Sequence, residues 1–153
     1  MSEKKVFLKQ GKERSLQINR HPWIFSGAID SCSEDIEPGD VAFVYSFQGE
    51  FLAQAYFQLE NSLAGRVLSF DQKPIYELLK ENIQKAWNLR SSLIDMSHTT
   101  CFRWINAEED GMPGLIVDYY DKVLVLQIST MGMEKLCPYV LQILLEVGKP
   151  RFI

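Results

Sequence analysis

The sequence predicts an α+β chain in which a small β-barrel precedes a compact α/β part built from antiparallel strands and two helices. Three observations carry this prediction. Residues 6–70 contain short strand-like runs separated by turn signals. From Pro74 onward, the apolar residues recur at helical spacing. Three further strand-like runs and a second helical stretch then follow, which is typical of strands packed against helices.

The first half contains five runs typical of strands, VFLK, SLQI, VAFVY, FLAQAYF and LAGRVLSF. Turn-forming residues separate several of these runs, at residues 10–12, 37–40 and 48–50. In SLQI, Leu16 and Ile18 alternate with polar residues, which predicts a strand. The stretch HPWIFSGAI has no clean period, and we expect a turn or a short helical piece there. Short strands at this spacing favour a small barrel or curled sheet.

The second half changes period at Pro74, which is tolerated in the first turn of a helix. A helix is predicted to end near Leu93, because apolar residues recur at helical spacing at Ile75, Leu78, Leu79, Ile83, Ala86 and Trp87. Strands are predicted for FRWINAE, GLIVDYY and KVLVLQIST. In the second helix, Pro138 should introduce a kink or mark the first turn, and Gly148 should follow the last residue. One side of this helix should be apolar, with Leu136, Val140, Leu141, Leu144 and Leu145.

Turn-forming pairs mark the stretch NAEEDGMPGLIVDYYDKVLVLQI, residues 106–128. Asp110-Gly111 and Pro113-Gly114 predict a sharp reversal before GLIVDYY, and residues 120–122 predict a second one. The acids Glu108, Glu109 and Asp110 could suggest a metal site or catalytic carboxylates. No histidine or further oxygen ligand stands near them in the sequence. We therefore interpret them as solvated loop acids and expect no metal site.

Composition indicates a folded protein without a membrane segment. Of the 153 residues, 46% are hydrophobic and 24% are charged. No apolar run approaches the roughly 20 residues that cross a bilayer, and the first ten residues lack the apolar core of a signal peptide. Cys32, Cys101 and Cys137 are far apart and odd in number, which disfavours disulfides and structural zinc. We expect a cytoplasmic protein that does not bind membranes.

Charge is distributed unevenly along the chain. The formal net charge is −4, yet residues 1–27 contain six lysines and arginines against two glutamates. A basic segment on an acidic chain is typical of an edge that contacts phosphates. A plain solvated edge with several lysines produces the same pattern. Charge alone therefore leaves both interpretations open.

Two stretches resemble a known family. LKQGKERSLQINRHPWIFSGAI, residues 8–29, resembles the opening of the RlmI-like large-subunit ribosomal RNA methyltransferases. RWINAEEDGMPGLIVDYYDKVLVLQISTMGMEKL, residues 103–136, is similar to the central region of the same family. The two matches stand in the family's order and at its separation. Together with the sequence between them, they cover most of the chain.

The resemblance implies a protein of three parts. A PUA domain, which is a small β-barrel found in RNA-modifying enzymes, corresponds to residues 1–72, and a central α/β domain to residues 73–153. A Rossmann-like domain that binds S-adenosylmethionine completes the family pattern, and no strand with a Gly-rich turn and a helix appears after Val123. We therefore expect a C-terminally truncated part of a longer protein. On this view, neither a cofactor site nor a catalytic residue lies in this chain.

The family's best-known activity is C5 methylation of a cytosine in 23S ribosomal RNA. The resemblance thus implies structured RNA, rather than DNA, as the partner. One departure concerns Glu109, which stands where the family often has glycine. If that position requires a positive φ, the turn must differ here. A second departure is the stretch at residues 55–61, where the family pattern has asparagine-proline.

The expected RNA contacts are cations along one edge, because PUA-type modules hold RNA mainly through phosphates and shape. Arg20 is the strongest candidate, since an arginine fork can donate two hydrogen bonds to a phosphate. The full set of candidates is Lys9, Lys12, Arg14, Arg20, His21 and Trp23. For Trp23 and Phe25, burial in the barrel core is the favoured interpretation over base stacking. Gly27 is expected to serve a backbone requirement rather than a ligand.

Two other functions stay open at this point. A free-standing adaptor could dock protein on an acidic second domain, with RNA affinity incidental. A self-contained enzyme would need a nucleophile and a base, for which Cys101 and His98 are the best candidates, although SHTTCF is typical of a loop entering a strand. The sequence also leaves open the target nucleotide and whether the chain forms a homodimer.

Overall fold

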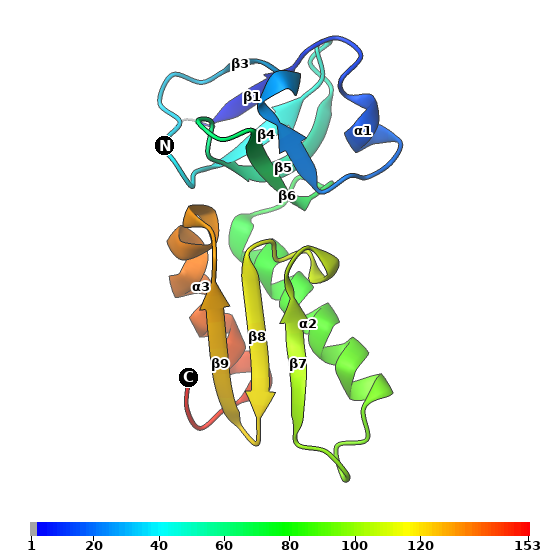
Figure 1. Cartoon of the computed structure of the whole chain (residues 1–153), viewed down its shortest axis with the longest axis vertical. Coiled ribbons are helices and arrows are strands. Elements are labelled where there is room, and N and C mark those ends of the chain that lie inside the picture. The colour runs from blue at the N-terminus through cyan, green and yellow to red at the C-terminus, as the bar shows by residue number, and fades with distance from the viewer. Residues whose placement is uncertain (1–2) are drawn as a thin grey trace. The chain divides into compact units, whose positions relative to one another are not determined.

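The computed structural model describes residues 3–153, which form two compact units, Met1–Lys73 and Pro74–Ile153 (Figure 1). The first unit is dominated by strands. The second combines three strands with two long helices. No helix in the described part of the chain is both long and apolar enough to span a membrane. Each unit has its own buried side chains and is described by itself.

The first unit is a mixed, curled six-stranded sheet with the order β2-β6-β5-β4-β1-β3. Only the pairing of β1 with β4 is parallel. The strands are β1 (Lys5–Leu8), β2 (Trp23–Phe25), β3 (Ile29–Cys32), β4 (Val41–Tyr45), β5 (Phe51–Phe57) and β6 (Leu63–Ser69). The edge strands β2 and β3 are consecutive in the chain and are joined by the short 3-10 helix η1 (Ser26–Ala28). The two edge strands of the curled sheet are therefore joined directly by the short connection through η1.

The core of this unit comes from alternate residues of nearly every strand. Val6, Leu8, Ile24, Val44 and Phe57 are all buried in one apolar cluster. Gly65 on β6 leaves the space that the Phe57 ring fills, because a Cβ there would lie 2.6 Å from that ring. The close approach of β6 to its neighbours thus depends on this glycine.

Two local predictions for the first unit are wrong. Residues Arg14–Gln17 form the short helix α1 instead of a strand. Leu16 is buried, while Ile18 is 64% exposed, because residues two apart point in different directions once the backbone is helical. The stretch HPWIFSGAI contains strand β2 as well as the short helical piece that was predicted. A three-residue strand is too short to give a period in the sequence.

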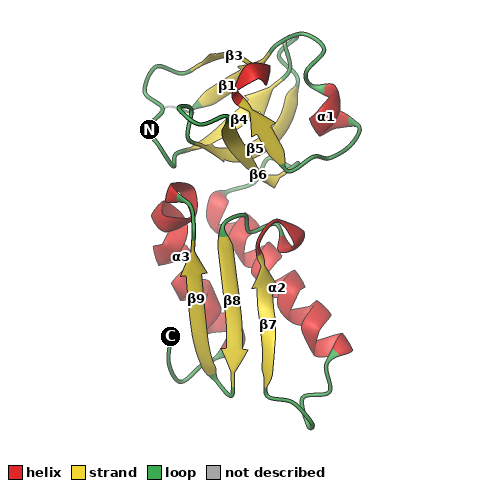
Figure 2. Cartoon of the chain, viewed as in Figure 1, coloured by secondary structure: helices red, strands yellow, loops and turns green. Residues whose placement is uncertain are grey.

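The second unit is an antiparallel meander with the order β7-β8-β9. Its strands are β7 (Cys101–Asn106), β8 (Leu115–Tyr120) and β9 (Val123–Ile128), and its helices are α2 (Ile75–Leu93) and α3 (Met131–Gly148). Both helices lie on the same side of the sheet (Figure 2). These elements agree with the predictions for residues 74–148. The turn at Asp121 and Lys122 has positive φ at both residues, as a two-residue hairpin turn requires.

The structure decides between the two positions expected for Pro138 in α3 and corrects the predicted place of Gly148. Thr130 caps it by accepting a hydrogen bond from the Met133 backbone N–H, and Pro138 lies inside the helix rather than in its first turn. Gly148 is the last helical residue, and Lys149 follows with φ 43°. A Cβ on Gly148 would lie 2.5 Å from the Trp104 ring, so a glycine is needed there for packing. Leu145, expected on the apolar side, is 53% exposed.

The acidic turn before β8 corrects another prediction. Asp110 accepts two hydrogen bonds of 2.7 Å from the Arg90 guanidinium and one from the Asn106 backbone N–H. Its side chain is only 7% exposed, so it is a buried structural acid rather than a solvated one. Within the 3-10 helix η2 (Ala107–Asp110), positive φ falls on Ala107, and then on Gly111 directly after η2. Glu109 therefore needs no glycine at its position.

Candidate nucleic-acid interface

A tight loop after β1 presents the first candidate cations. The Lys9 backbone N–H donates to the Ala28 carbonyl at 2.9 Å, and the Lys9 ammonium donates to the Gly27 carbonyl at 3.2 Å. Gly11 takes φ +81°, which lets the loop turn back so that Lys12 N–H reaches the Lys9 carbonyl. Lys9 is thereby fixed beside η1. Lys12 then stands at the start of the segment that forms α1.

The helix α1 presents Arg14 to solvent and buries Leu16. Ser15 on the same turn donates its hydroxyl to the Lys12 carbonyl at 3.3 Å. Within residues 3–153, neither Lys12 nor Arg14 forms an ion pair. These two cations are therefore available to an anionic ligand. Two hollows lie next to this helix, and Leu16 lines both of them.

The first hollow contains Arg20. Its backbone has φ 48°, a conformation that non-glycine residues seldom adopt, and its guanidinium lies 4.8 Å from the centre of the Phe70 ring. The space is about 210 Å³ and is also lined by Gln17, Phe51 and Leu52. The ring contact holds Arg20 at the surface without neutralising its charge. This hollow is distinct from the one that contains His21 and Trp23.

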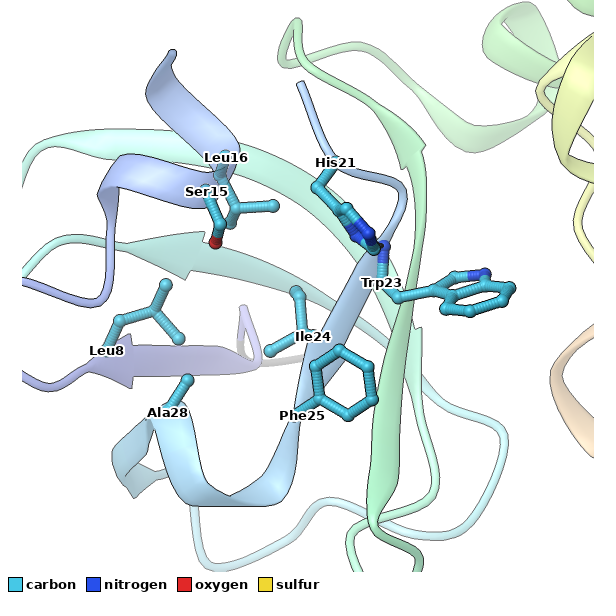
Figure 3. A pocket seen from close by; sticks show the side chains of 8 residues that line it. All are labelled: Leu8, Ser15, Leu16, His21, Trp23, Ile24, Phe25 and Ala28. Carbon is cyan, nitrogen blue, oxygen red and sulfur yellow. Dashed lines mark hydrogen bonds between the residues drawn. The ribbon is translucent and has the colours of Figure 1, made fainter. Parts of the chain in front are cut away.

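The second hollow, here named the aromatic cleft, lies against β2 (Figure 3). Its volume is about 110 Å³, and its walls are almost entirely apolar. Ile24 points inward and is 3% exposed, while its neighbours Trp23 and Phe25 are 39% and 51% exposed. The prediction that Trp23 and Phe25 belong to the core is thus wrong. Successive side chains of a strand point to opposite faces, and the core takes only Ile24.

His21 is held beside these rings by two hydrogen bonds. Its backbone N–H donates to the Ser15 carbonyl at 3.0 Å, and its Nδ1 accepts from the Trp23 backbone N–H at 3.1 Å. In the neutral imidazole, the proton then resides on Nε2. The His21 ring lies 5.8 Å from the Trp23 ring and 6.5 Å from the Phe25 ring. His21 therefore presents a defined N–H donor among aromatic faces.

The predicted residues fall into two groups. His21 and Trp23 line the aromatic cleft, and Lys9 and Lys12 are hydrogen-bonded to residues next to it or in its wall, Lys9 to the Gly27 carbonyl and Lys12 through its own backbone carbonyl to Ser15. Arg14 precedes Ser15 on α1, and Arg20 lines the other hollow. Gly27 has no positive φ, and a Cβ there would meet open space, so the backbone requirement expected for it is absent.

Sequence reasoning missed three contributors to this surface. Phe25 and Ser15 line the cleft, and Arg66 on β6 is the pairing partner of Trp23. Arg66 is the only charged residue in LAGRVLSF, a run otherwise made of apolar, glycine and serine residues. That isolation is the signal that could have drawn attention to it, because a cation in the middle of a barrel strand must point outward.

Charged groups of the second unit are engaged with one another. Hydrogen bonds from Lys80, Tyr76 and Gln142 lower the pKa of the Glu146 carboxyl, with Lys80 the largest cause. His98 lies 2.7 Å from the Asp95 carboxylate, whose pKa is lowered first by the Ser97 hydroxyl. The Cys101 sulfur lies 3.9 Å from the Thr100 hydroxyl. The Nδ1 of His98 thus contacts the Asp95 carboxylate and, at 3.1 Å, the Ser97 hydroxyl.

No group of three or more histidine, cysteine, aspartate or glutamate side chains in the described residues could hold a metal ion. The cysteines are all unpaired thiols. Cations and aromatic rings of the first unit are thus the strongest ligand-binding feature of the described chain.

Comparison with known proteins matches the first unit to a domain family and most of the chain to curated relatives. A family model for the PUA-like domain matches residues 6–70. A ribosomal RNA large subunit methyltransferase I from Vibrio cholerae is 36% identical over 130 residues, covering 84% of this chain and 32% of that protein. The protein of the same name from Vibrio vulnificus is 36% identical over 143 residues, covering 93% and 36% respectively. The chain therefore spans about a third of the length of these curated relatives.

A solved structure shares the fold. It is described as a SAM-dependent methyltransferase from Streptococcus mutans and matches with a TM-score of 0.78 at 17% identity. The match covers 95% of this chain and 38% of that one, and at this identity it concerns the fold alone. The sequence similarity to the curated relatives is far stronger and extends across both units. With its PUA-like domain and these relatives, the chain belongs to the RlmI-like family.

Proposed function

We propose that the chain is the RNA-binding and positioning part of an S-adenosylmethionine-dependent methyltransferase that acts on large-subunit ribosomal RNA. Residues 1–72 would be the PUA-like module and residues 73–153 the central domain. The methyl donor would bind outside these two units, and methyl transfer would not occur in them. The partner would be 23S ribosomal RNA in the cytoplasm, with a cytosine C5 as the methylated atom.

One observation carries this proposal. Lys12 and Arg14 have no ion-pair partner among residues 3–153 and stand on the segment that borders both hollows. Unpaired cations beside exposed aromatic rings suit a polyanion that also offers flat apolar faces. The names of the curated relatives, which are ribosomal RNA methyltransferases, support RNA as that polyanion.

The adaptor alternative depended on an acidic second domain. The two units in fact each contain eight basic and ten acidic residues. In the second unit, Asp110 and Asp118 are paired with arginines, and Glu146 is paired with Lys80. Acidity is therefore not concentrated in that unit, and these three acids are neutralised by cations. A protein-docking role has no specific feature in its favour.

The test is a salt titration of RNA binding by the 153-residue chain. Affinity for a structured fragment of 23S ribosomal RNA would be measured by fluorescence anisotropy between low and moderate salt. We expect log K to fall steeply with log salt, and the slope to decrease by about 0.9 for each duplex phosphate contact removed, as in Lys12→Ala. The matched control is Lys85→Ala, because Lys85 is an exposed cation of α2 paired with Glu81. Absence of salt-dependent binding, or an equal change of slope in both variants, would refute the proposal.

A further inference from the structure

Two large aromatic side chains beside the aromatic cleft are unusually exposed to solvent. Trp23 and Phe25 leave 39% and 51% of their surface accessible, next to a cleft of about 110 Å³ with apolar walls. A cavity of about 150 Å³ holds one benzene molecule. The cleft is thus of the size that takes much of one flat ring, with the remainder of the ring outside. Stacking of a base on an aromatic side chain buries such faces in a sequence-tolerant way.

The cleft has two polar groups whose hydrogen-bonding capacity is defined. The Nδ1 of His21 accepts from the Trp23 backbone N–H, so Nε2 is the donor of the neutral ring. The Ser15 hydroxyl donates to the Lys12 carbonyl, which leaves its oxygen lone pairs as acceptors. A donor and an acceptor on apolar walls match the edge of a nucleobase, which presents both kinds of group. Aliphatic or lipid ligands would leave both unmatched.

Positive charge stands at the rim. The Lys9 ammonium is held against the Gly27 carbonyl, next to Ala28 in the cleft wall, and the backbone carbonyl of Lys12, an exposed residue, accepts from Ser15 in the opposite wall. A nucleotide whose base enters the cleft has its phosphate about one sugar away from the ring, where these cations can approach it. Charge and ring surface are therefore arranged for the two ends of one nucleotide.

We propose that the aromatic cleft binds a single unpaired nucleobase of the RNA, stacked on Phe25 and hydrogen-bonded by His21 Nε2–H, while the Trp23 indole points away from the cleft (Figure 3). This inference rests on the proposed function and adds a base contact to its phosphate contacts. The bound nucleotide is a bulged or loop residue, since a base within a duplex has its faces occupied by stacking. It serves to fix the position of the RNA on the PUA-like unit.

The experiment compares two RNA hairpins that differ at one bulged position, with an adenosine in one and an abasic nucleotide in the other. Both contain the same phosphates, so the salt slope should be equal. The hairpin with the base should bind about 5- to 150-fold more tightly, which corresponds to the usual contribution of one stacked base. Phe25→Ala should abolish that difference while the salt slope is retained. His21→Phe keeps a ring and loses the donor, so it should reduce the difference in part.

The control variant is Phe47→Ala. Phe47 is 57% exposed in the same unit and does not line the cleft, so its removal should leave the preference for the base intact. Thermal unfolding of each variant would confirm that the barrel is folded. Equal affinity for the two hairpins with a retained salt slope would refute the cleft and leave the proposed function standing. Loss of salt-dependent binding to both hairpins would refute the proposed function and the cleft together.

Discussion

The tryptophans Trp104 and Trp23, one from each unit, show two different uses of an aromatic side chain. In the second unit, Trp104 is completely buried, its ring centre lies 4.6 Å from that of Trp87, and its indole N–H donates to the Ile83 carbonyl. In the first unit, Trp23 and Phe25 stand on an edge strand with much of their surface exposed. Trp104 thus serves packing, as Phe57 does in the first unit, whereas Trp23 and Phe25 form part of a surface. Position on the sheet, rather than residue type, separates the two roles.

Some cations also differ between the units, although Lys4 of the first unit is paired with Asp40. Arg90, Arg103 and Lys80 of the second unit are bound to Asp110, Asp118 and Glu146. Lys12 and Arg14 of the first unit have no acid partner within residues 3–153. A chain of net negative charge can therefore still present a positive edge. The following predictions test this contrast between the units, beginning with the largest expected effect.

Trp104→Ala should remove about 3–5 kcal/mol from the free energy of unfolding, because it leaves a cavity beside α3 and removes the hydrogen bond from the indole N–H to the Ile83 carbonyl. Trp23→Ala should cost less, since 39% of Trp23 is already exposed whereas Trp104 is completely buried. Urea denaturation followed by far-UV circular dichroism measures both. Similar losses in the two variants would contradict the contrast.

Asp110→Ala should destabilise the second unit by about 2–3 kcal/mol, because it leaves the Arg90 guanidinium partly buried without its carboxylate. Asp118→Ala breaks the pair with Arg103, whose side chain is 49% exposed, and should have a much smaller effect. Urea denaturation at two salt concentrations distinguishes them. The loss in Asp110→Ala should persist at high salt, and a loss that disappears would show a solvated acid instead.

Lys12→Ala combined with Arg14→Ala should lower the salt slope of RNA binding by about 1.8, equal to two duplex phosphates. Arg20→Ala should lower it by about 0.9 and act independently, because Arg20 lines a different hollow. Anisotropy titrations of the triple variant test whether the changes add. A triple variant no weaker than the double one would exclude Arg20 from the interface.

The Glu146 carboxyl should titrate below pH 4.5, the ordinary pKa of glutamate, because Lys80, Tyr76 and Gln142 stabilise its charged form. A depressed folded-state pKa gives stability that is present above the unfolded pKa and lost as the pH falls through the folded one. Carbon-detected NMR titration measures this pKa directly. In Lys80→Met, the Glu146 pKa should rise toward 4.5, whereas in Lys85→Met it should not change.

Much of the second unit could be predicted from the sequence. The helix from Ile75 to Leu93, the three strands and the turn at Asp121-Lys122 follow from period and turn chemistry, which are local. Asp110 could not be assigned, because its role depends on Arg90, twenty residues earlier in the chain. Long-range ion pairs leave no local pattern.

The first unit was harder to predict because its elements are short. The alternation of Leu16 and Ile18 suggests a strand, yet only Leu16 is buried and the backbone is helical. Candidate cations could be named from charge, whereas their grouping around the cleft depends on hydrogen bonds from Lys9 to Gly27 and from Ser15 to Lys12. Trp23 and Phe25 are exposed because the opposite face of β2, which carries Ile24, packs on the core. The pairing of β2 with β6 determines which face that is, and this pairing is not visible in the sequence.

The direct connection between the two edge strands has a dynamic consequence. Among the described residues, β2 is paired in the sheet with β6 only, and its C-terminal end continues through η1 into β3. This seam should open more often than the rest of the sheet, and its amide protons should exchange with solvent fastest among the strands. A ligand that contacts Phe25 on β2 and Lys9 beside η1 would fasten the seam. The PUA-like unit would then stiffen on binding, and slowed hydrogen exchange at the Phe25 and Ile29 amides would report it.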